Sequence, residues 1–171
     1  RLPALGGYSR IVQSPGYVAI YYEAGQGGGG NRVIPVDGSA HLPSHIRQWY
    51  GDARGRWEGN TLVVDVTHFT GETWFDRSGN FHSPSLHVVE RYTRTGPDHM
   101  RYEVTIEDPE VFTEPWQMSM PLYRRVEENI RVLEYECYAL AEDQAFNDST
   151  TTAVIDPTVV GRGLIRAKGV G

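Results

Sequence analysis

The chain has 171 residues, of which 39% are hydrophobic and 22% are charged, and this is the length and composition of one globular domain with a sizeable core. Its net charge of −6 and the lack of any basic run argue against nucleic acid or an anionic membrane as a partner, because both need clustered lysine or arginine. No stretch approaches the roughly 18 apolar residues of a membrane helix, so we expect no membrane insertion.

Many glycines, prolines and tyrosines favour short strands joined by tight turns. Strands are predicted over residues 8–13 and 17–23, and a proline–glycine turn joins them. A third strand is predicted over residues 32–36, which completes an antiparallel meander. The glycine run at residues 27–30 lacks the Lys-Ser/Thr of a phosphate-binding loop, so it is interpreted as a hairpin tip and no cofactor is assigned.

Residues 39–52 break this strand pattern, and they are predicted to contain one helical turn that starts near Ser44. A hairpin follows over residues 54–58 and 61–69, with Gly-Asn as its turn. Residues 70–84 then form a long polar excursion from the sheet.

Period-two alternation of apolar and polar residues returns in the second half of the chain. It predicts strands over residues 86–94, 100–107 and 116–122, and a ninth strand over residues 133–137. No apolar stripe with a helical period competes with this pattern. The predicted fold class is all-β: an antiparallel meander that closes into a lipocalin-like barrel or forms a two-sheet sandwich.

Composition shifts near residue 147, so the chain divides into an antiparallel β domain at residues 1–146 and an extended tail at residues 147–171. The tail has strand propensity but no hairpin partner in the sequence, which is typical of a strand donated to another molecule. Asn147 begins an Asn-Asp-Ser triplet and is a candidate glycosylation acceptor. The residues predicted to form the donated strand are Thr152, Val154, Ile155, Val159, Val160, Leu164 and Ile165.

Five blocks stand out in order along the chain. They are IRQWYGDARGRWEGNTLVV at residues 46–64, LHVVERYTR at residues 86–94, IEDP at residues 106–109, PW through PL at residues 115–122, and EYEC at residues 134–137. In this combination the chain resembles a large group of secreted, β-rich proteins from soil and freshwater bacteria. The resemblance implies export and a β-rich domain, and it implies no activity.

His41 and His45 are four residues apart, which would place both on one face of a helix, and Asp52 or His82 is available as a third metal ligand. The sequence has no HExxH or CxxC motif that would fix such a site. Loop histidines that hydrogen-bond to the backbone are therefore the favoured interpretation, and no metal ligand is assigned.

His82 and His87 flank Ser83-Pro84-Ser85 and lie near Glu90, so the residue types of a Ser–His–acid hydrolase are present here. The serine lacks the Gly-x-Ser-x-Gly turn and no oxyanion hole can be identified, so no catalytic residue is assigned.

Glu90 alternates in phase with apolar residues of its strand, so its carboxylate is expected to point inward. There it would hold a ligand or, as the favoured interpretation, form an ion pair with Arg54 or Arg56. Among the tryptophans, Trp57 and Trp116 are predicted to lie in the core, and Trp74 is the best candidate for an exposed ring that binds a sugar or lipid. The candidate ligand-binding residues are Glu90, Trp74, His82 and His87.

Three functions remain after these exclusions. The favoured one is a non-enzymatic structural subunit of a secreted or periplasmic bacterial polymer, a homo-oligomer or filament linked by strand addition of the tail. The alternatives are a lipocalin-like barrel that binds one small ligand, and a hydrolase or isomerase at a barrel mouth. The chain begins at Arg1 with neither methionine nor signal peptide, so we expect either that a leader was removed or that the chain belongs to a longer polypeptide.

Overall fold

The computed structural model describes residues 8–22, 30–75 and 78–130 of the chain. Within these residues the chain forms eight strands and no helix. The strands are β1 (Ser9–Ser14), β2 (Tyr17–Tyr22), β3 (Gly30–Pro35), β4 (Asp52–Glu58), β5 (Thr61–Thr67), β6 (His87–Arg94), β7 (His99–Glu107) and β8 (Trp116–Tyr123).

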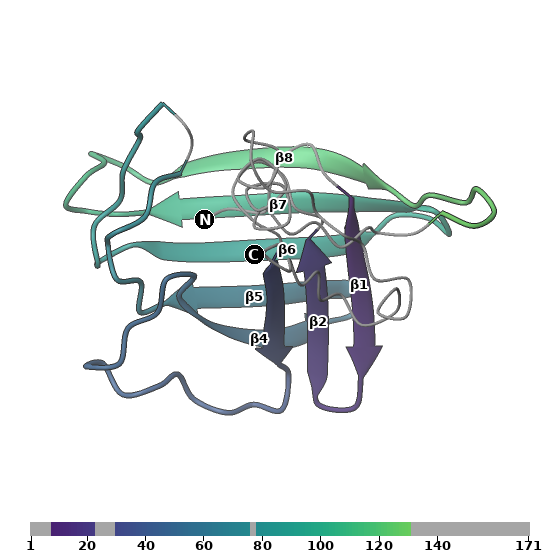
Figure 1. The fold of residues 1–171 in the computed structure, drawn as a ribbon, viewed down its shortest axis with the longest axis horizontal. Helices are drawn as coiled ribbons and strands as arrows, with labels where there is room; N and C mark the ends of the chain where they lie inside the picture. The colour runs from purple at the N-terminus through teal and green to yellow at the C-terminus, as the bar shows by residue number, and fades with distance from the viewer. Residues whose placement is uncertain (1–7, 23–29, 76–77, 131–171) are drawn as a thin grey trace, which may run out of the picture.

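The eight strands form two antiparallel sheets, a small one in the order β1-β2-β3 and a large one in the order β4-β5-β6-β7-β8. The strands of the small sheet run across those of the large sheet (Figure 1). Every pairing within a sheet joins consecutive strands, so the all-β class and the antiparallel meander are confirmed. Two sheets are compatible with the predicted sandwich, and the described strands do not join into one closed barrel.

The core contains side chains from both sheets and follows the period-two pattern of the strands. On β7, Tyr102, Val104 and Ile106 are buried while the residues between them are more exposed. Complete burial of a Val, Ile or Leu side chain contributes about 1.5–3 kcal/mol, so this alternation fixes which face of each strand is internal. The buried members of the core are Val18, Ile20, Ile34, Ala53, Leu62, Val64, Val66, Phe69, Leu86, Val88, Tyr92, Tyr102, Val104 and Ile106.

The small sheet approaches the large sheet closely at Gly55 of β4. A Cβ atom at this position would lie 2.7 Å from Cγ1 of Val36 and 2.9 Å from Cγ2 of Ile34, which is closer than real Cβ contacts. The missing side chain at residue 55 therefore allows β3 and the residue that follows it to pack against β4.

The loop between β3 and β4 contains a turn at residues 44–45 in place of the predicted helical turn. Its backbone continues to Gln48, whose N–H donates to the carbonyl oxygen of His68 at 2.8 Å and whose carbonyl oxygen accepts from Thr70 N at 3.1 Å. These bonds form an isolated parallel bridge between Gln48 and Phe69. Gln48 thus pairs with the residues that directly follow β5, a contact that sequence periodicity does not reveal.

Several sequence predictions fall outside the described residues. They are the ninth strand at residues 133–137, the glycine run at residues 27–29, and the tail at residues 147–171 with its donor residues and Asn147. Where the structure is described, it contains no helix of the length and apolar character needed to cross a membrane.

Candidate functional site

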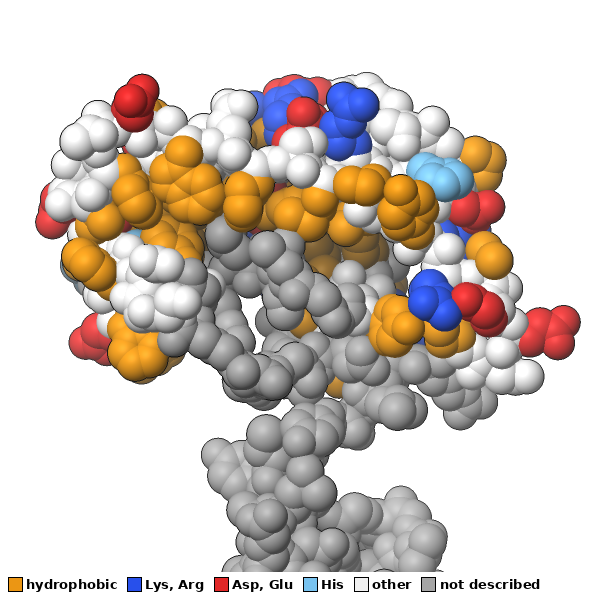
Figure 2. Space-filling model, turned by 90° about the horizontal axis from the view of Figure 1, so that it is seen from above, with side chains coloured by type: hydrophobic (Ala, Val, Ile, Leu, Met, Phe, Trp, Pro, Cys, Tyr) orange, Lys and Arg blue, Asp and Glu red, His pale blue; other side chains and the backbone are white. Residues whose placement is uncertain are grey.

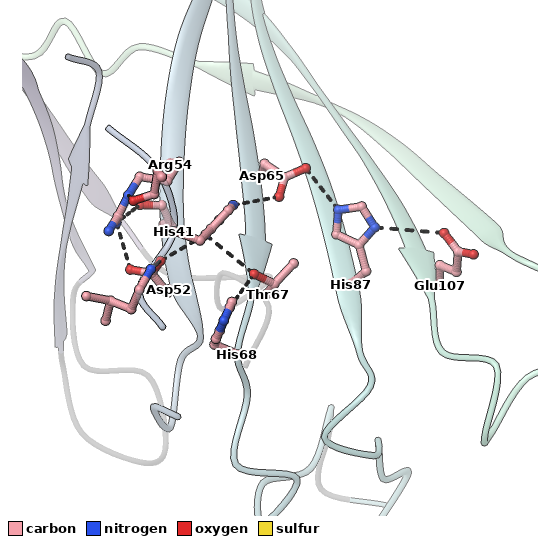
Figure 3. A network of polar contacts seen from close by, with 11 residues as sticks. His41, Asp52, Arg54, Asp65, Thr67, His68, His87 and Glu107 are labelled. Atoms are coloured by element: carbon pink, nitrogen blue, oxygen red, sulfur yellow. Dashed lines mark hydrogen bonds and ion pairs between the residues drawn. The ribbon is translucent and has the colours of Figure 1, made fainter. Parts of the chain in front are cut away.

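A row of ionisable side chains crosses the outer face of the large sheet (Figure 3). Asp65 alternates along β5 with Val64 and Val66, which point into the core, so its carboxylate lies on the opposite face. His41 from the loop before β4 and His87 from β6 contact it there, and side chains of β4 and β7 extend the row on either side. In order across the sheet, the row consists of Arg54, Asp52, His41, Asp65, His87 and Glu107.

His41 lies between two carboxylates. Its Nδ1 is 2.8 Å from Oδ2 of Asp52, and its Nε2 is 3.0 Å from Oδ1 of Asp65. The ring of His41 is 27% exposed, so solvent reaches this part of the row. A carboxylate only accepts hydrogen bonds and a neutral imidazole has one N–H, so a neutral His41 ring can donate to only one of the two carboxylates.

Asp52 is buried and is held from several sides. Its Oδ1 accepts from Nη1 of Arg54 at 2.7 Å, and its Oδ2 accepts from the backbone N–H of Leu42 at 3.0 Å. Burial opposes ionisation of Asp52, but the hydrogen bonds from Leu42 and His41 and the charge of Arg54 outweigh it, so the pKa of Asp52 is lowered. Asp52 is therefore an oriented anion next to His41.

Asp65 links His41 to His87. Its Oδ2 accepts from Nε2 of His87 at 2.9 Å, while Nδ1 of His87 faces Oε2 of Glu107 at 3.8 Å. The hydrogen bond from His87 lowers the pKa of Asp65. The same bond, helped by the charges of Asp65 and Glu107, raises the pKa of His87. This half of the row is a half-exposed ion pair between two strands.

His68 joins the row directly after β5. Its ring stacks on that of His41 with 5.7 Å between centroids, and its Nδ1 lies 2.6 Å from Oγ1 of Thr67. The backbone of His68 has a φ of 61°, a left-handed conformation that few residues other than glycine adopt. The ligand atoms of His41, Asp52 and His68 all lie within 4.8 Å of one another.

Gly51 determines where this cluster forms. It has a φ of 71°, and a Cβ atom there would lie 2.7 Å from the carbonyl oxygen of Thr67 and 2.8 Å from both Phe69 and Val66. Only glycine allows the loop to come this close to β5. The close approach places Asp52 next to the end of β5, where His68 lies.

The predicted metal set is therefore only partly brought together. His41 and Asp52 are in contact, but His45 is exposed in the loop and does not belong to the cluster. His82 is buried elsewhere, where its Nδ1 donates to the Ser83 carbonyl oxygen at 3.1 Å and its Nε2 is 2.6 Å from the hydroxyl of Thr73. The helical turn that would have paired His41 with His45 does not form.

The candidate residues for a hydrolase do not come together into a catalytic site. Oγ of Ser83 donates to Oδ1 of the buried Asp108 at 2.7 Å, and the Ser83 N–H donates to Oδ2 at 2.6 Å. His87 and Glu90 project from opposite faces of β6, because they are an odd number of residues apart on one strand. Both hydrogen bonds from Ser83 to Asp108 therefore hold the loop before β6 in place.

Glu90 points inward as predicted, but its partner is Arg32 of β3 and not Arg54 or Arg56. Those two arginines pair with Asp52 and Glu58, on the other face of the sheet. The prediction failed because the partner comes from the opposite sheet, whose packing no local pattern indicates.

Trp74 is 64% exposed, which agrees with its prediction, and it forms an isolated antiparallel bridge with the exposed Phe81. Trp116 is partly buried against the core. The prediction for Trp57 was wrong: it is 46% exposed, although it lies opposite the buried Leu62 near the end of β4. The four candidate ligand-binding residues do not form a single site, since Glu90 is internal and His87 lies on the outer face.

The two sheets also have edge strands that bear on self-association. Within the described residues β1 pairs with β2 alone, and all six of its residues are exposed. At the far end of the large sheet, β8 contains Pro121 and has β7 as its only partner among the strands that the structure describes. Figure 2 looks onto this second edge, where hydrophobic side chains form a band. The partly buried apolar residues of β8 are Trp116, Met118, Met120 and Leu122.

Sequence reasoning missed the contributions of Asp65 and His68. The alternation of Val64, Asp65 and Val66 puts Asp65 on the polar face of its strand, but its neighbours His41 and His87 are 24 and 22 residues away along the chain. His68 follows a clear strand and carries no motif. The one available signal was the glycine at position 51 before Asp52, which marks a close approach of the backbone.

Comparison with known proteins finds no matching family model, no matching curated protein and no matching solved structure. Function therefore has to be inferred from these residues and their geometry.

Proposed function

We propose that this chain is a non-enzymatic structural subunit, exported by its bacterium, that assembles with copies of itself by strand addition. The two-sheet sandwich is the body of the subunit and β1 is the edge that receives the added strand. The observation that supports this most is the state of β1, which is an edge strand among the described residues and has all six of its residues exposed. Unpaired N–H and C=O groups along such an edge are a template for another strand.

Apart from the charged side chain of Arg10, devices that usually protect an edge are missing from β1. It contains no proline, no lysine and no bulge, since its six residues pair with β2 in unbroken register. Ile11 and Val12 are 42% and 51% exposed, so the edge is apolar as well as open. By contrast, β8 contains Pro121, which lacks an N–H and is typical of a protected edge. The acceptor is therefore assigned to β1.

The proposed donor is the tail of a second copy, at residues 150–166. Its sequence is rich in β-branched residues, and an extended peptide of this kind adds to a sheet edge through main-chain hydrogen bonds. Donor and acceptor are different surfaces of one chain, so the contact is heterologous. Such contacts generate rings or open filaments. Export is supported by the resemblance to secreted proteins.

The test measures the size of the full-length chain by analytical ultracentrifugation over a range of concentrations. Val12→Pro and Gln13→Pro are each compared with the unmodified chain. Successive N–H groups of a strand point alternately toward its partner and away from it, so one of the two prolines removes an N–H that faces β2 and the other removes an N–H that faces outward. One of these substitutions removes only an outward N–H group, leaves the fold intact and should abolish assembly. Val154→Lys and Ile155→Lys test the donor in the same way, because alternate residues of an added strand face the acceptor.

Val33→Ser is the matched control. Val33 is 56% exposed on the outer face of the small sheet, away from the β1 edge, so strand addition should survive this change. Assembly lost in Val33→Ser but retained in both proline variants would mean face-to-face association and would contradict the proposal. A full-length chain that is monomeric at all concentrations would also contradict it.

A second candidate function is ligand binding through exposed aromatic rings. Trp74 and Phe81 are 64% and 59% exposed and are joined by an antiparallel bridge, an arrangement that suits stacking on a sugar ring. Titration of tryptophan fluorescence with oligosaccharides tests this function. A saturable change that disappears in Trp74→Ala would support it, and an unchanged spectrum would exclude these sugars as ligands.

A further inference from the structure

The cluster at the end of β5 has a composition suited to a metal ion. His41, Asp52 and His68 offer two imidazole nitrogens and one carboxylate oxygen, and these atoms lie within 4.8 Å of one another. Two histidines and one carboxylate form a common protein ligand set for zinc and other first-row divalent metals. Three protein ligands leave a coordination position for water or another molecule.

Each of the three residues is also held by a contact with a neighbour outside the cluster. Nε2 of His41 contacts the carboxylate of Asp65 at 3.0 Å, and Oδ1 of Asp52 accepts from Arg54 at 2.7 Å. Nδ1 of His68 contacts the hydroxyl of Thr67 at 2.6 Å. Metal ligands in proteins are typically oriented by such outer hydrogen bonds, above all by a carboxylate behind a histidine. The cluster has this support for all three residues.

The two carboxylates around His41 present more acceptors than a neutral imidazole ring can satisfy. If Nε2–H donates to Asp65, Nδ1 carries a lone pair that faces the oxygen of Asp52 at 2.8 Å, and two acceptors at this distance repel each other. A divalent ion bound by both atoms removes the conflict. A second proton on His41 would also remove it, but it gives no role to His68.

His68 is held in a strained conformation that favours the cluster. A φ of 61° is a backbone conformation that non-glycine residues seldom adopt, and such strain is concentrated at functional sites. The conformation is maintained by the hydrogen bond from Gln48 N to the carbonyl oxygen of His68, at 2.8 Å. The result is a ring stacked beside His41.

We propose that His41, Asp52 and His68 bind one Zn²⁺ ion per chain, with Asp65 as the positioning residue behind His41 and with water in the remaining position. The site lies on the outer face of the large sheet, on a different sheet from the β1 edge. Zinc binding is therefore independent of strand addition.

The experiment is calorimetric titration of the full-length chain with ZnCl₂, supported by metal analysis after dialysis. One Zn²⁺ should bind per chain. His68→Asn is the main variant, because asparagine tolerates a positive φ while removing the imidazole. It should weaken zinc binding by more than about 100-fold, since outer-shell changes alone cost about 10–100-fold. Asp65→Asn should fall within that outer-shell range.

His45→Ala is the matched control, because His45 belongs to the same loop but not to the cluster. It should bind zinc as tightly as the unmodified chain. The visible absorption of bound Co²⁺ gives a second readout, with bands that appear in the unmodified chain and in His45→Ala and are lost in His68→Asn. Circular dichroism checks that each variant is folded.

Three results would overturn the proposal. The first is the absence of stoichiometric zinc, and the second is undiminished binding by folded His68→Asn. The third is an equal loss of binding in His45→Ala.

Discussion

Arg32 of β3 and Glu90 of β6 form an ion pair that joins the two sheets through the interior. Glu90 is 1% exposed, and its Oε1 also accepts from the hydroxyls of Tyr102 at 2.9 Å and Tyr92 at 3.2 Å. Burial raises the pKa of both tyrosines, and the negative charge of Glu90 raises them further, so both remain neutral donors. The carboxylate is thus held by three donors from two sheets.

Removing one partner of this pair should destabilise the protein strongly. Glu90→Gln leaves the guanidinium of Arg32 inside without its counter-charge, and a broken buried pair costs about 3–5 kcal/mol. Unfolding in urea, followed by circular dichroism, measures the loss. The double variant Arg32→Met/Glu90→Gln should lose less than the sum of the two single variants, because no unpaired charge is left.

Glu58→Gln is the control for this prediction. Glu58 pairs with Arg56 and Arg91 on the exposed outer face, where solvent screens the interaction, so its loss should have little effect. Equal destabilisation by Glu58→Gln and Glu90→Gln would mean that the interior pair does not hold the sheets together.

Gly51 should be far less replaceable than Gly38. Both have positive φ angles, of 71° and 79°, so alanine suffers a similar backbone strain at either position. Only at Gly51 would the new Cβ collide with its surroundings, 2.7 Å from the Thr67 carbonyl oxygen, whereas nothing lies within 4 Å at Gly38. Gly51→Ala should therefore cost about 1–3 kcal/mol more than Gly38→Ala. Equal urea midpoints for the two variants would contradict this account of the loop.

Asp108 should be needed to hold the loop before β6. It is buried and accepts from Ser83 N at 2.6 Å, from Ser83 Oγ at 2.7 Å and from Glu110 N at 3.2 Å. Asp108→Ala leaves the buried donors of Ser83 unsatisfied, at a cost of about 1–3 kcal/mol each. Thermal unfolding should show a clear loss, and an unchanged melting temperature would mean that other groups anchor the loop.

His87 should make stability depend on pH. Its pKa in the folded chain is raised by the hydrogen bond to Asp65, so protonated His87 stabilises the fold. This contribution is complete below the unfolded pKa of about 6.5 and is lost as the pH rises through the folded pKa. The stability difference between the unmodified chain and His87→Gln should therefore shrink as the pH rises from about 5 to about 9. A difference that is constant or grows with pH would contradict the assigned pair.

Local patterns predicted the strands well because each was specified by its own residues. The alternation over residues 100–107 gave both the position of β7 and its internal face, which runs through Tyr102 to Ile106. The proline–glycine turn likewise predicted the hairpin of β1 and β2, whose register continues to the pair of Ser14 and Tyr17.

The candidate site could be predicted only in part, because its contacts depend on tertiary packing. His41 and Asp52 were singled out from the sequence, but His45 was chosen as their partner on helical spacing that the loop does not adopt. Arg32 lies 58 residues from Glu90, and no local pattern links positions on two different sheets. The position of His68 depends on the pairing of Gln48 with the end of β5.

The most direct test of strand addition is hydrogen–deuterium exchange at β1, measured by mass spectrometry on the full-length chain at low and at high concentration. If β1 receives a strand from another copy, peptides that contain residues 9–14 should exchange more slowly at high concentration, while those that contain β5 should not change. Exchange at residues 9–14 that is equally fast in monomers and assemblies would contradict the assignment of β1 as the acceptor.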